Sequence, residues 1–446
     1  MRNAAPEALA IRIIRALRAR GHQAYLVGGC VRDRLLGYLP KDFDVSTDAR
    51  PEEIARYFSQ SHLVGTHFGV VRVHGTNEQG ENGQPVEVAT FRSESAYSDG
   101  RRPEEVHFET DPALDARRRD FTVNGLMEDP LSGQVIDHVG GKADLQTKTI
   151  RAIGDARDRF QEDYLRMLRA IRFAVRLGFA IEPATFSAIQ EHAHYASQIS
   201  AERVRDELVG ILTSGNAREG LELLDRSGLL RYILPEVKAL QGVEQPPEFH
   251  PEGDVWTHVM IMLEQMQQPS PTLAFGVLLH DVGKPSTFRI AERIRFDGHV
   301  DVGTAIAKRL LMRLRFSNGD IEQITALVAN HMKFKDVRSM RLSTLKRFLR
   351  LTDFAEHLEL HRLDCLASNG RTDSYDFVCD KLGQLSDEEM RPPRLVTGED
   401  LLRIGYKTGR HLGEVLAAIE TLQLEGEIAT REEAVVRART MLVPEN

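Results

Sequence analysis

The chain has 446 residues, of which 41% are hydrophobic and 28% charged, and its formal net charge is −8. This length exceeds what a single hydrophobic core fills, so we expect about two to four globular domains. The negative balance excludes a chain that is basic throughout, but a local basic face can still bind nucleic acid. With three cysteines and no apolar run of about 18 residues, we expect a cytoplasmic protein without a disulfide framework, signal peptide or membrane partner.

The stretch 25–47 combines a glycine turn with two closely spaced carboxylates. An apolar strand ends at Gly28-Gly29, a short helix follows, and a second strand is expected to carry Asp42 and Asp44. Residues two apart in a strand share a face, and two carboxylates held side by side repel unless a cation lies between them. Carboxylate oxygens suit Mg²⁺, and the amides of a glycine turn can bind phosphates, as nucleotidyl transfer requires. The alternative is a polar edge on a half-buried strand.

Residues 1–150 alternate strand-like and helix-like patterns. We predict strands at 63–74 and 85–91, a polar hairpin loop at 77–84 and a long loop at 93–112. Glu87 lies in the second of these strands and is expected to be the third carboxylate of the metal site.

Other polar residues of the same region could bind a nucleotide. Arg32 follows the glycine turn and is a potential phosphate ligand, with Asp33 as its structural partner. The cluster Arg118-Arg119-Asp120 could place a guanidinium on phosphate and a carboxylate on ribose hydroxyls. The alternatives are a surface ion pair and a solvated charge run.

Residues 162–176 carry two regular stripes. Four arginines recur at intervals of 3, 3 and 4 residues, and four apolar residues repeat with the same spacing one position earlier. On an α-helix these stripes lie about 100° apart, so one can pack on a core while the other lines a polar cleft. The arginines are Arg166, Arg169, Arg172 and Arg176, and the apolar residues are Leu165, Leu168, Ile171 and Val175.

Asp163 and Arg166 are three positions apart and could read the edge of a base. Asp163 would accept from an exocyclic amine and Arg166 would donate to the adjacent ring nitrogen, a pattern that suits cytosine and adenine. Uracil and guanine present a carbonyl and an N–H there, so their rejection could reach several kcal/mol. The alternative is an ordinary surface ion pair, worth a few tenths of a kcal/mol.

From about residue 157 the pattern is helical almost throughout. Helices are predicted at 162–177, 201–213, 217–230, 256–267, 303–314 and 319–332. A Pro- and Gly-rich linker is predicted at 241–253, and a second break at 390–393. The predicted fold is therefore an α/β head at 1–150, followed by an all-α body divided into 151–245, 246–385 and 386–446.

The motifs, taken in order, resemble the class II tRNA nucleotidyltransferase and bacterial poly(A) polymerase family, within the polymerase-β nucleotidyltransferase superfamily. They are GGCVRD…DFD, RRDFT, the DHVGG block, EDYLR, and ERVRDEL at 202–208. The resemblance covers nearly the whole chain. It implies a polymerase-β-like head with a mixed sheet, an RNA-binding helical neck at 151–245, and extension of tRNA 3′ ends with C-C-A from CTP and ATP on a protein template.

The resemblance also implies roles for individual residues. Asp42 and Asp44 occupy the Mg²⁺-binding positions and, with Glu87, form the expected catalytic set, while Asp163 and Arg166 pair with the incoming base. The expected nucleotide-binding set is Gly28, Gly29, Arg32, Arg119, Asp120, Asn124, Asp163, Arg166, Arg169 and Arg172.

Activities within the family divide. Poly(A) polymerases usually carry a G-[RK]-[RK]-F signature, whereas residues 65–68 here are Gly-Thr-His-Phe. The loop 93–103 is present, which resembles enzymes that add the full CCA or A alone. We therefore expect full CCA addition, with A-only addition as the second alternative and poly(A) synthesis as the third.

The segment 246–385 resembles the HD phosphohydrolase superfamily, through HPEGDVWTH, LLHDVGKP, FDGH, ANH and HRLDC. Imidazole and carboxylate suit a divalent transition metal such as Ni, Mn or Co, which would generate a hydroxide for phosphoester hydrolysis. The resemblance implies His258, His280, Asp281 and Asp364 as core ligands, with His299 and His331 able to hold a second metal. The alternatives are a degenerate HD fold that only packs helices, and a metal phosphohydrolase whose head merely binds RNA.

The tail at 386–446 has Gly398, Gly405 and Gly409 between short helices. By the same resemblance it contacts the tRNA elbow, and the alternative is a packing cap.

Overall fold

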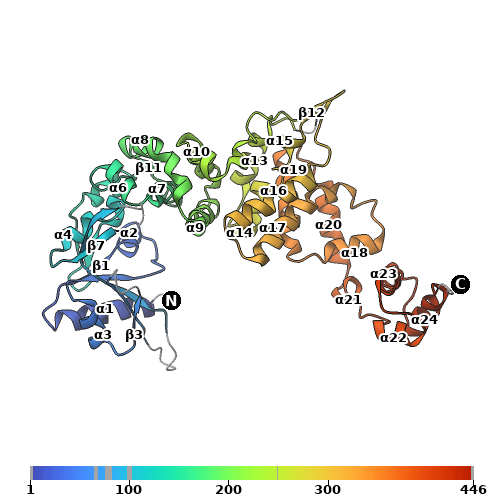
Figure 1. Cartoon of the computed structure of the whole chain (residues 1–446), viewed down its shortest axis with the longest axis horizontal. Coiled ribbons are helices and arrows are strands. Elements are labelled where there is room, and N and C mark those ends of the chain that lie inside the picture. The colour runs from blue at the N-terminus through green and yellow to red at the C-terminus, as the bar shows by residue number, and fades with distance from the viewer. Residues whose placement is uncertain (1–3, 65–68, 76–82, 98–102, 249, 443–446) are drawn as a thin grey trace. The chain divides into compact units, whose positions relative to one another are not determined.

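The computed structural model describes residues 4–64, 69–75, 83–97, 103–248 and 250–442. The chain forms two compact units, residues 1–238 and residues 239–446 (Figure 1). No helix among the described residues has the length and apolar character needed to cross a membrane.

The first unit is built on a seven-stranded mixed sheet with the order β3-β4-β5-β2-β1-β8-β9. Only β2 and β5 run parallel, and the other neighbours are antiparallel. The strands are β1 (Ala24–Val27), β2 (Asp44–Thr47), β3 (Ser61–Val64), β4 (Val70–Val73), β5 (Val86–Thr90), β8 (Met127–Asp129) and β9 (Gln134–Ile136). Helix α1 (Ala4–Arg18) packs on β1, β2 and β5 through buried Ile13, Ile14 and Leu17. The predicted α/β head with a mixed sheet is confirmed.

The single strand predicted at 63–74 is wrong, because the chain reverses within it. Strands β3 and β4 pair antiparallel, with Val64 opposite Val70. Residues 65–68, which include the Gly-Thr-His-Phe segment, and most of the predicted loop 77–84 lie outside the described residues. The strand predicted at 85–91 is confirmed as β5.

The long loop predicted at 93–112 is also wrong. Strands β6 (Arg92–Tyr97) and β7 (Pro103–Phe108) form an antiparallel ribbon, and α4 (Pro112–Arg117) begins directly after it. A two-stranded ribbon is held by backbone pairing and needs no apolar alternation, so the polar sequence gave no strand signal. Residues 98–102, at the tip of the predicted loop 93–103, lie outside the described residues.

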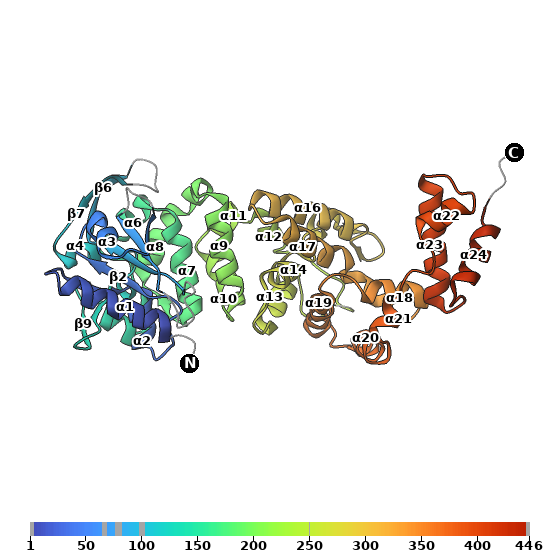
Figure 2. The same ribbon diagram turned by 90° about the horizontal axis from the view of Figure 1, so that it is seen from below.

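Residues 156–238 of the first unit form a mainly helical neck, in which α7, α9 and α10 are neighbours (Figure 2). Its helices are α6 (Ala156–Glu162), α7 (Leu165–Leu177), α8 (Pro183–His192), α9 (Ala201–Leu212), α10 (Ala217–Arg226), α11 (Leu230–Ile233) and α12 (Pro235–Lys238). The helix predicted to begin at residue 162 begins at Leu165, because α6 ends at Glu162 and Asp163 accepts a hydrogen bond from the Leu165 amide (3.1 Å). The apolar stripe of α7 is fully or almost fully buried.

The second unit is helical apart from the short hairpin β12 (Arg289–Ile290) and β13 (Ile294–Arg295). Its main helices are α13 (Val255–Gln265), α14 (Pro271–Leu279), α15 (Lys284–Thr287), α16 (His299–Arg313), α17 (Asn318–Asn330), α18 (Leu342–Leu349), α19 (Phe354–Ala367), α20 (Asp373–Gln384) and α21 (Asp387–Met390). Helices α13, α14, α17 and α19 pack around one another. The all-α body is as predicted.

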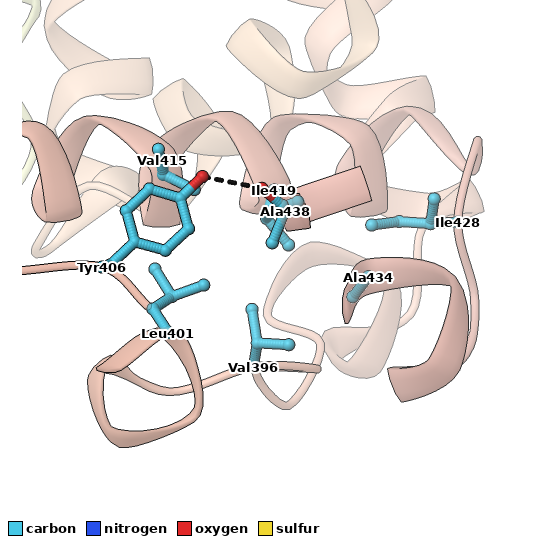
Figure 3. Close-up of a cluster of buried hydrophobic side chains, with 8 residues drawn as sticks. All are labelled: Val396, Leu401, Tyr406, Val415, Ile419, Ile428, Ala434 and Ala438. Atoms are coloured by element: carbon cyan, nitrogen blue, oxygen red, sulfur yellow. Dashed lines mark hydrogen bonds between the residues drawn. The ribbon is translucent and has the colours of Figure 1, made fainter. Parts of the chain in front are cut away.

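The tail forms α22 (Gly398–Arg403), α23 (Arg410–Glu425) and α24 (Arg431–Thr440) around a core of its own (Figure 3). Leu401, Ile419 and Ala434 lie in this core, and the Tyr406 hydroxyl donates to the carbonyl of Ala438 (2.7 Å). A buried polar group needs such a partner, so Tyr406 joins the end of α24 to the rest of the tail.

Candidate nucleotide site and candidate metal centre

The glycine turn and Asp44 lie side by side in the head. Val27, the last residue of β1, pairs with Asp44, the first residue of β2, and α2 (Gly29–Leu35) begins right after Gly28. Gly28 has φ +73°, and a Cβ there would lie 3.2 Å from a terminal nitrogen of Arg119. Only glycine combines this backbone conformation with so close an approach of the arginine.

The three predicted carboxylates do not all lie on the sheet. Asp44 and Glu87 are paired across the parallel strands β2 and β5, but Asp42 precedes β2 and is outside the strand. The predicted same-strand geometry is therefore wrong for Asp42, whose carboxylate instead accepts from Gln84 (2.9 Å). Glu87 accepts from Arg72 on β4 (2.9 Å). Of the three, only Asp44 lines the cleft beside Gly28 and Gly29, which is called the nucleotide cleft below.

Asp44 lies in an environment that disfavours its negative charge. Its side chain is open to the cleft but closely surrounded by protein, and this partial loss of water raises its pKa to about 6, with Glu87 and Asp42 adding to the rise and Arg119 opposing it. A divalent cation would relieve the repulsion, and carboxylate oxygens are the ligands that Mg²⁺ prefers. The residues present therefore fit a magnesium site.

We expect Asp44→Asn to stabilise the metal-free protein near pH 7.5. The pKa of Asp44 is raised in the folded state, so its carboxylate does not destabilise the fold below about pH 4. The protein loses stability as the pH rises through 6 and the carboxylate ionises. Cleft water screens the repulsion, so the gain should be about 1 kcal/mol, or about 2–4 °C in melting temperature. Thermal melts in EDTA should show this gain at pH 7.5 and lose it near pH 4, and an unchanged melting temperature at pH 7.5 would contradict the electrostatic reading.

The nucleotide cleft has a volume of about 450 Å³ and is lined mainly by cationic side chains. Its lining is Gly28, Gly29, Arg32, Asp44, Arg118, Arg119, Asp120, Asn124, Asp163, Arg166, Arg169, Arg172, Phe173, Arg176 and Arg203. Buried Asp115 holds Arg118 (2.7 Å) and Arg119 (3.1 Å) in this wall. A cavity of this size and charge suits a nucleoside triphosphate.

Asp120 is an internal anchor of the cleft wall. Its carboxylate accepts from Arg169 (2.7 Å), the Phe121 amide (2.8 Å) and Asn124 (3.2 Å), and Asn124 in turn accepts from Arg32 (2.6 Å). Burial alone would raise the pKa of Asp120, but Arg169 and these hydrogen bonds bring it to about 2. The carboxylate therefore stays ionised and fixes the positions of Arg169 and Asn124.

Asp163 and Arg166 both line the cleft, and each is held by a different partner. Arg203 on α9 donates a hydrogen bond to each carboxylate oxygen of Asp163, at 3.1 and 2.7 Å. Arg166 pairs with Glu162 and donates to the Arg118 carbonyl (3.2 Å). The two side chains therefore have separate partners in the cleft wall, Arg203 for Asp163 and Glu162 for Arg166.

Two cleft residues, Phe173 and Arg203, had no predicted site role, whereas Arg118 and Arg176 were predicted only as members of the arginine cluster and the arginine stripe, outside the nucleotide-binding set. Phe173 packs against the guanidinium groups of Arg32, Arg169 and Arg172, at 5.3, 5.2 and 4.5 Å from its ring centre. The sequence held a signal for Arg203, which lies in the ERVRDEL motif, but its partner is 40 residues away.

A second polar cluster lies in the second unit, where two of the three groups of potential metal ligands found among its described residues contain the residues named by the HD resemblance. One triad is His258, His280 and Asp364, and the other is Asp281, His299 and His331. Within each triad the ligand atoms lie within 4.8 Å of one another. The structure thus brings together all six residues that the HD resemblance named, on α13, α16, α19 and the ends of α14 and α17.

The four histidines of this cluster are poised to bind through Nε2. Nδ1 of His280, His299 and His331 donates to a backbone carbonyl (2.8, 2.9 and 2.6 Å). Every Nε2 atom is buried without a hydrogen bond among the described residues, although carboxylate oxygens lie 3.1 to 3.8 Å away. Buried polar atoms need partners, and metal-bound histidines typically donate their other nitrogen in this way. The donor set therefore fits a divalent transition metal.

Charges around this centre favour a cation. Burial alone would raise the pKa of Asp281, but His280 and Lys284 hold it well below its usual range. Burial, aided by His280, lowers the pKa of His331 to about 4, so this imidazole is neutral and able to bind metal. For His258 burial acts in the same direction, but Asp364 and Glu252 outweigh it and raise the pKa to about 9.

A cavity of about 640 Å³ opens beside the metal cluster. Its lining includes the ligands His299, His331 and Asp364 and five cationic side chains, Lys284, Arg293, Arg295, Lys335 and Arg371. A cationic cavity next to a metal centre can hold a phosphate ester against a metal-bound hydroxide.

Three family models match the chain in order: Poly A polymerase head domain at 24–151, probable RNA and SrmB-binding site of polymerase A at 178–241, and HD domain at 254–356. Together with the mixed-sheet head and its cleft, they define the class as a nucleotidyltransferase with an HD domain.

The relatives narrow the class further. The CCA-adding enzyme of Ligilactobacillus salivarius is 31% identical over 444 residues, covering 98% of this chain and 96% of that protein, and that of Enterococcus faecalis is 32% identical over 425 residues, covering 95% and 93%. The crystal structure of the Bacillus stearothermophilus CCA-adding enzyme in complex with CTP has a TM-score of 0.73 at 26% identity and covers 99% of both chains. The chain belongs to the CCA-adding enzyme family.

Proposed function

We propose that this protein adds C and A from CTP and ATP to the 3′ end of tRNA in the cytoplasm. Each addition joins the RNA 3′-oxygen to the α-phosphorus, the bond to the β-phosphate breaks, and pyrophosphate leaves. The observation that carries the proposal is a single cleft holding Asp44, the glycine turn, and the Asp163 and Arg166 pair. Incubation with a tRNA lacking CCA and one nucleotide at a time tests it.

In this proposal the head carboxylates would hold Mg²⁺, and the bound ion would supply positive charge that favours ionisation of the 3′-hydroxyl and balances the phosphates. Asp44 and Asp42 are the proposed ligands, with Glu87 beside Asp44 as the third carboxylate. Arg32, Arg119, Arg169 and Arg172 would balance triphosphate charge, while Asp120 and Asn124 hold these groups in place.

Base selection is assigned to Asp163 and Arg166. Oδ1 of Asp163 already accepts from Leu165 and Arg203, whereas Oδ2 accepts from Arg203. A carboxylate oxygen can accept two hydrogen bonds, so Oδ2 has room for one exocyclic amine. Cytosine and adenine carry that amine and uracil does not, so uracil would leave the carboxylate facing a carbonyl oxygen.

A second candidate function, metal-dependent phosphoester hydrolysis, is favoured by the unsatisfied Nε2 atoms beside a cationic cavity. A metal such as Ni, Mn or Co would be held by His258, His280, Asp281 and Asp364, with His299 and His331 able to bind a second ion. When bound, the metal supplies a hydroxide at neutral pH, and the cavity cations orient the phosphate.

Asp281→Ala should remove HD-domain metal and lower hydrolysis by at least about 10²-fold, because Asp281 belongs to one triad and its carboxylate lies 3.1 Å from Nε2 of His280 in the other. Metal content and cleavage of bis(p-nitrophenyl) phosphate measure the two effects, and C and A incorporation should persist. The matched control is Asp301→Ala, which removes an exposed carboxylate from α16. Full hydrolysis in the Asp281 variant would rule out this metal centre.

A further inference from the structure

Glu252 lies outside the six metal ligands, between two histidines. Its Oε1 atom is 2.7 Å from Nδ1 of His258 and 2.9 Å from Nδ1 of His250. The Glu252 side chain is only 6% exposed. An ionised carboxylate can only accept, so both imidazoles must carry their proton on Nδ1. Glu252 thereby fixes the orientation of two rings with one oxygen atom.

His258 depends on this contact more than the other histidines do. His280, His299 and His331 each place Nδ1 on a main-chain carbonyl, which no substitution removes. Nδ1 of His258 is held by a side chain instead. The metal-facing Nε2 of His258 is therefore aimed by a residue 6 positions earlier in the chain.

His250, the second imidazole held by Glu252, lines the 640 Å³ cavity. Its ring centre lies 5.1 Å from that of His258, with the two rings nearly perpendicular. The carboxylate thus links one ring of the metal cluster to one ring of the cavity wall.

We infer that Glu252 is a positioning residue of the HD metal centre: it orients His258 toward the metal and His250 toward the cavity. The inference rests on the metal site proposed above. Loss of a carboxylate partner behind a metal-bound histidine typically weakens metal binding by about 10- to 100-fold. A glutamine at the same place keeps an acceptor oxygen for the two histidines but loses the negative charge that strengthens both hydrogen bonds, so its effect should be intermediate.

The test is Co²⁺ titration of the EDTA-stripped full chain, followed by calorimetry and by the visible absorption of the bound ion. All proteins carry Asp44→Asn, which removes one of the two proposed head ligands and so weakens Co²⁺ binding in the head. We expect Glu252→Ala to weaken Co²⁺ binding by about 10- to 100-fold and Glu252→Gln by less. Glu248→Gln, an exposed neighbour, should bind as the parent does.

Parental affinity in Glu252→Ala would overturn the inference, provided that Asp281→Ala loses binding. Binding that survives in Asp281→Ala, or is absent from the parent, would instead overturn the metal site itself. Thermal melting of the metal-stripped proteins shows whether Glu252→Ala is folded. If it is not, Glu252→Gln, which is nearly isosteric, takes its place, and parental Co²⁺ affinity in that variant would overturn the inference.

Discussion

Asp44→Ala should abolish incorporation of both C and A, lowering kcat by at least about 10³-fold. Of the three predicted catalytic carboxylates, Asp44 alone lines the cleft, and it lies beside the glycine turn. Its raised pKa marks a charge that the fold tolerates poorly unless a cation is bound. Single-turnover incorporation of labelled CTP into a tRNA lacking CCA measures the loss.

Two controls separate chemistry from folding in that experiment. Glu52→Ala removes an exposed carboxylate from α3 (Pro51–Tyr57) of the same head and should retain parental incorporation. HD-domain metal content should also be unchanged in Asp44→Ala. Parental C and A incorporation in Asp44→Ala would contradict the assignment of the cleft.

Asp163→Ala should erode base discrimination, raising the ratio of kcat/KM for UTP over CTP by about 10- to 100-fold. The reason is that the unfavourable contact between a carboxylate and the uracil carbonyl, worth about 1–3 kcal/mol, disappears with the side chain. Arg203→Ala should shift the same ratio in the same direction, because Arg203 holds both oxygens of Asp163. Competition between CTP and UTP on one tRNA reports the ratio directly.

The matched control for this second prediction is Arg205→Ala, two residues further along α9, whose guanidinium pairs with Asp206. It should leave the ratio at the parental value. An Asp163→Ala enzyme that still rejects UTP as the parent does would show that another group reads the base. If only the Arg203→Ala enzyme kept the parental ratio of UTP to CTP use, Asp163 would remain the residue that reads the base, and Arg203 would not be needed to hold it.

Local sequence patterns predicted the parts of the site that depend on short-range geometry. The arginine spacing of α7 placed Arg166, Arg169, Arg172 and Arg176 on one cleft wall, because helical periodicity alone decides that face. The glycine turn and Asp44 were likewise predictable, since both lie at the ends of neighbouring strands.

Contacts between distant segments could not be predicted in this way. Arg32 reaches Asn124 across 92 positions, and Arg203 reaches Asp163 across 40. Nothing in local periodicity encodes such pairs, which tertiary packing creates. The same limit explains the ribbon of β6 and β7, whose strands are held by each other and carry no apolar pattern.

The most direct test of the central claim supplies a tRNA lacking CCA with CTP alone, ATP alone, UTP alone, and CTP with ATP. We predict two added nucleotides with CTP, three with CTP and ATP together, and negligible addition with UTP. No addition of C to this tRNA with CTP alone would contradict full CCA synthesis, and long A tails with ATP alone would contradict it equally.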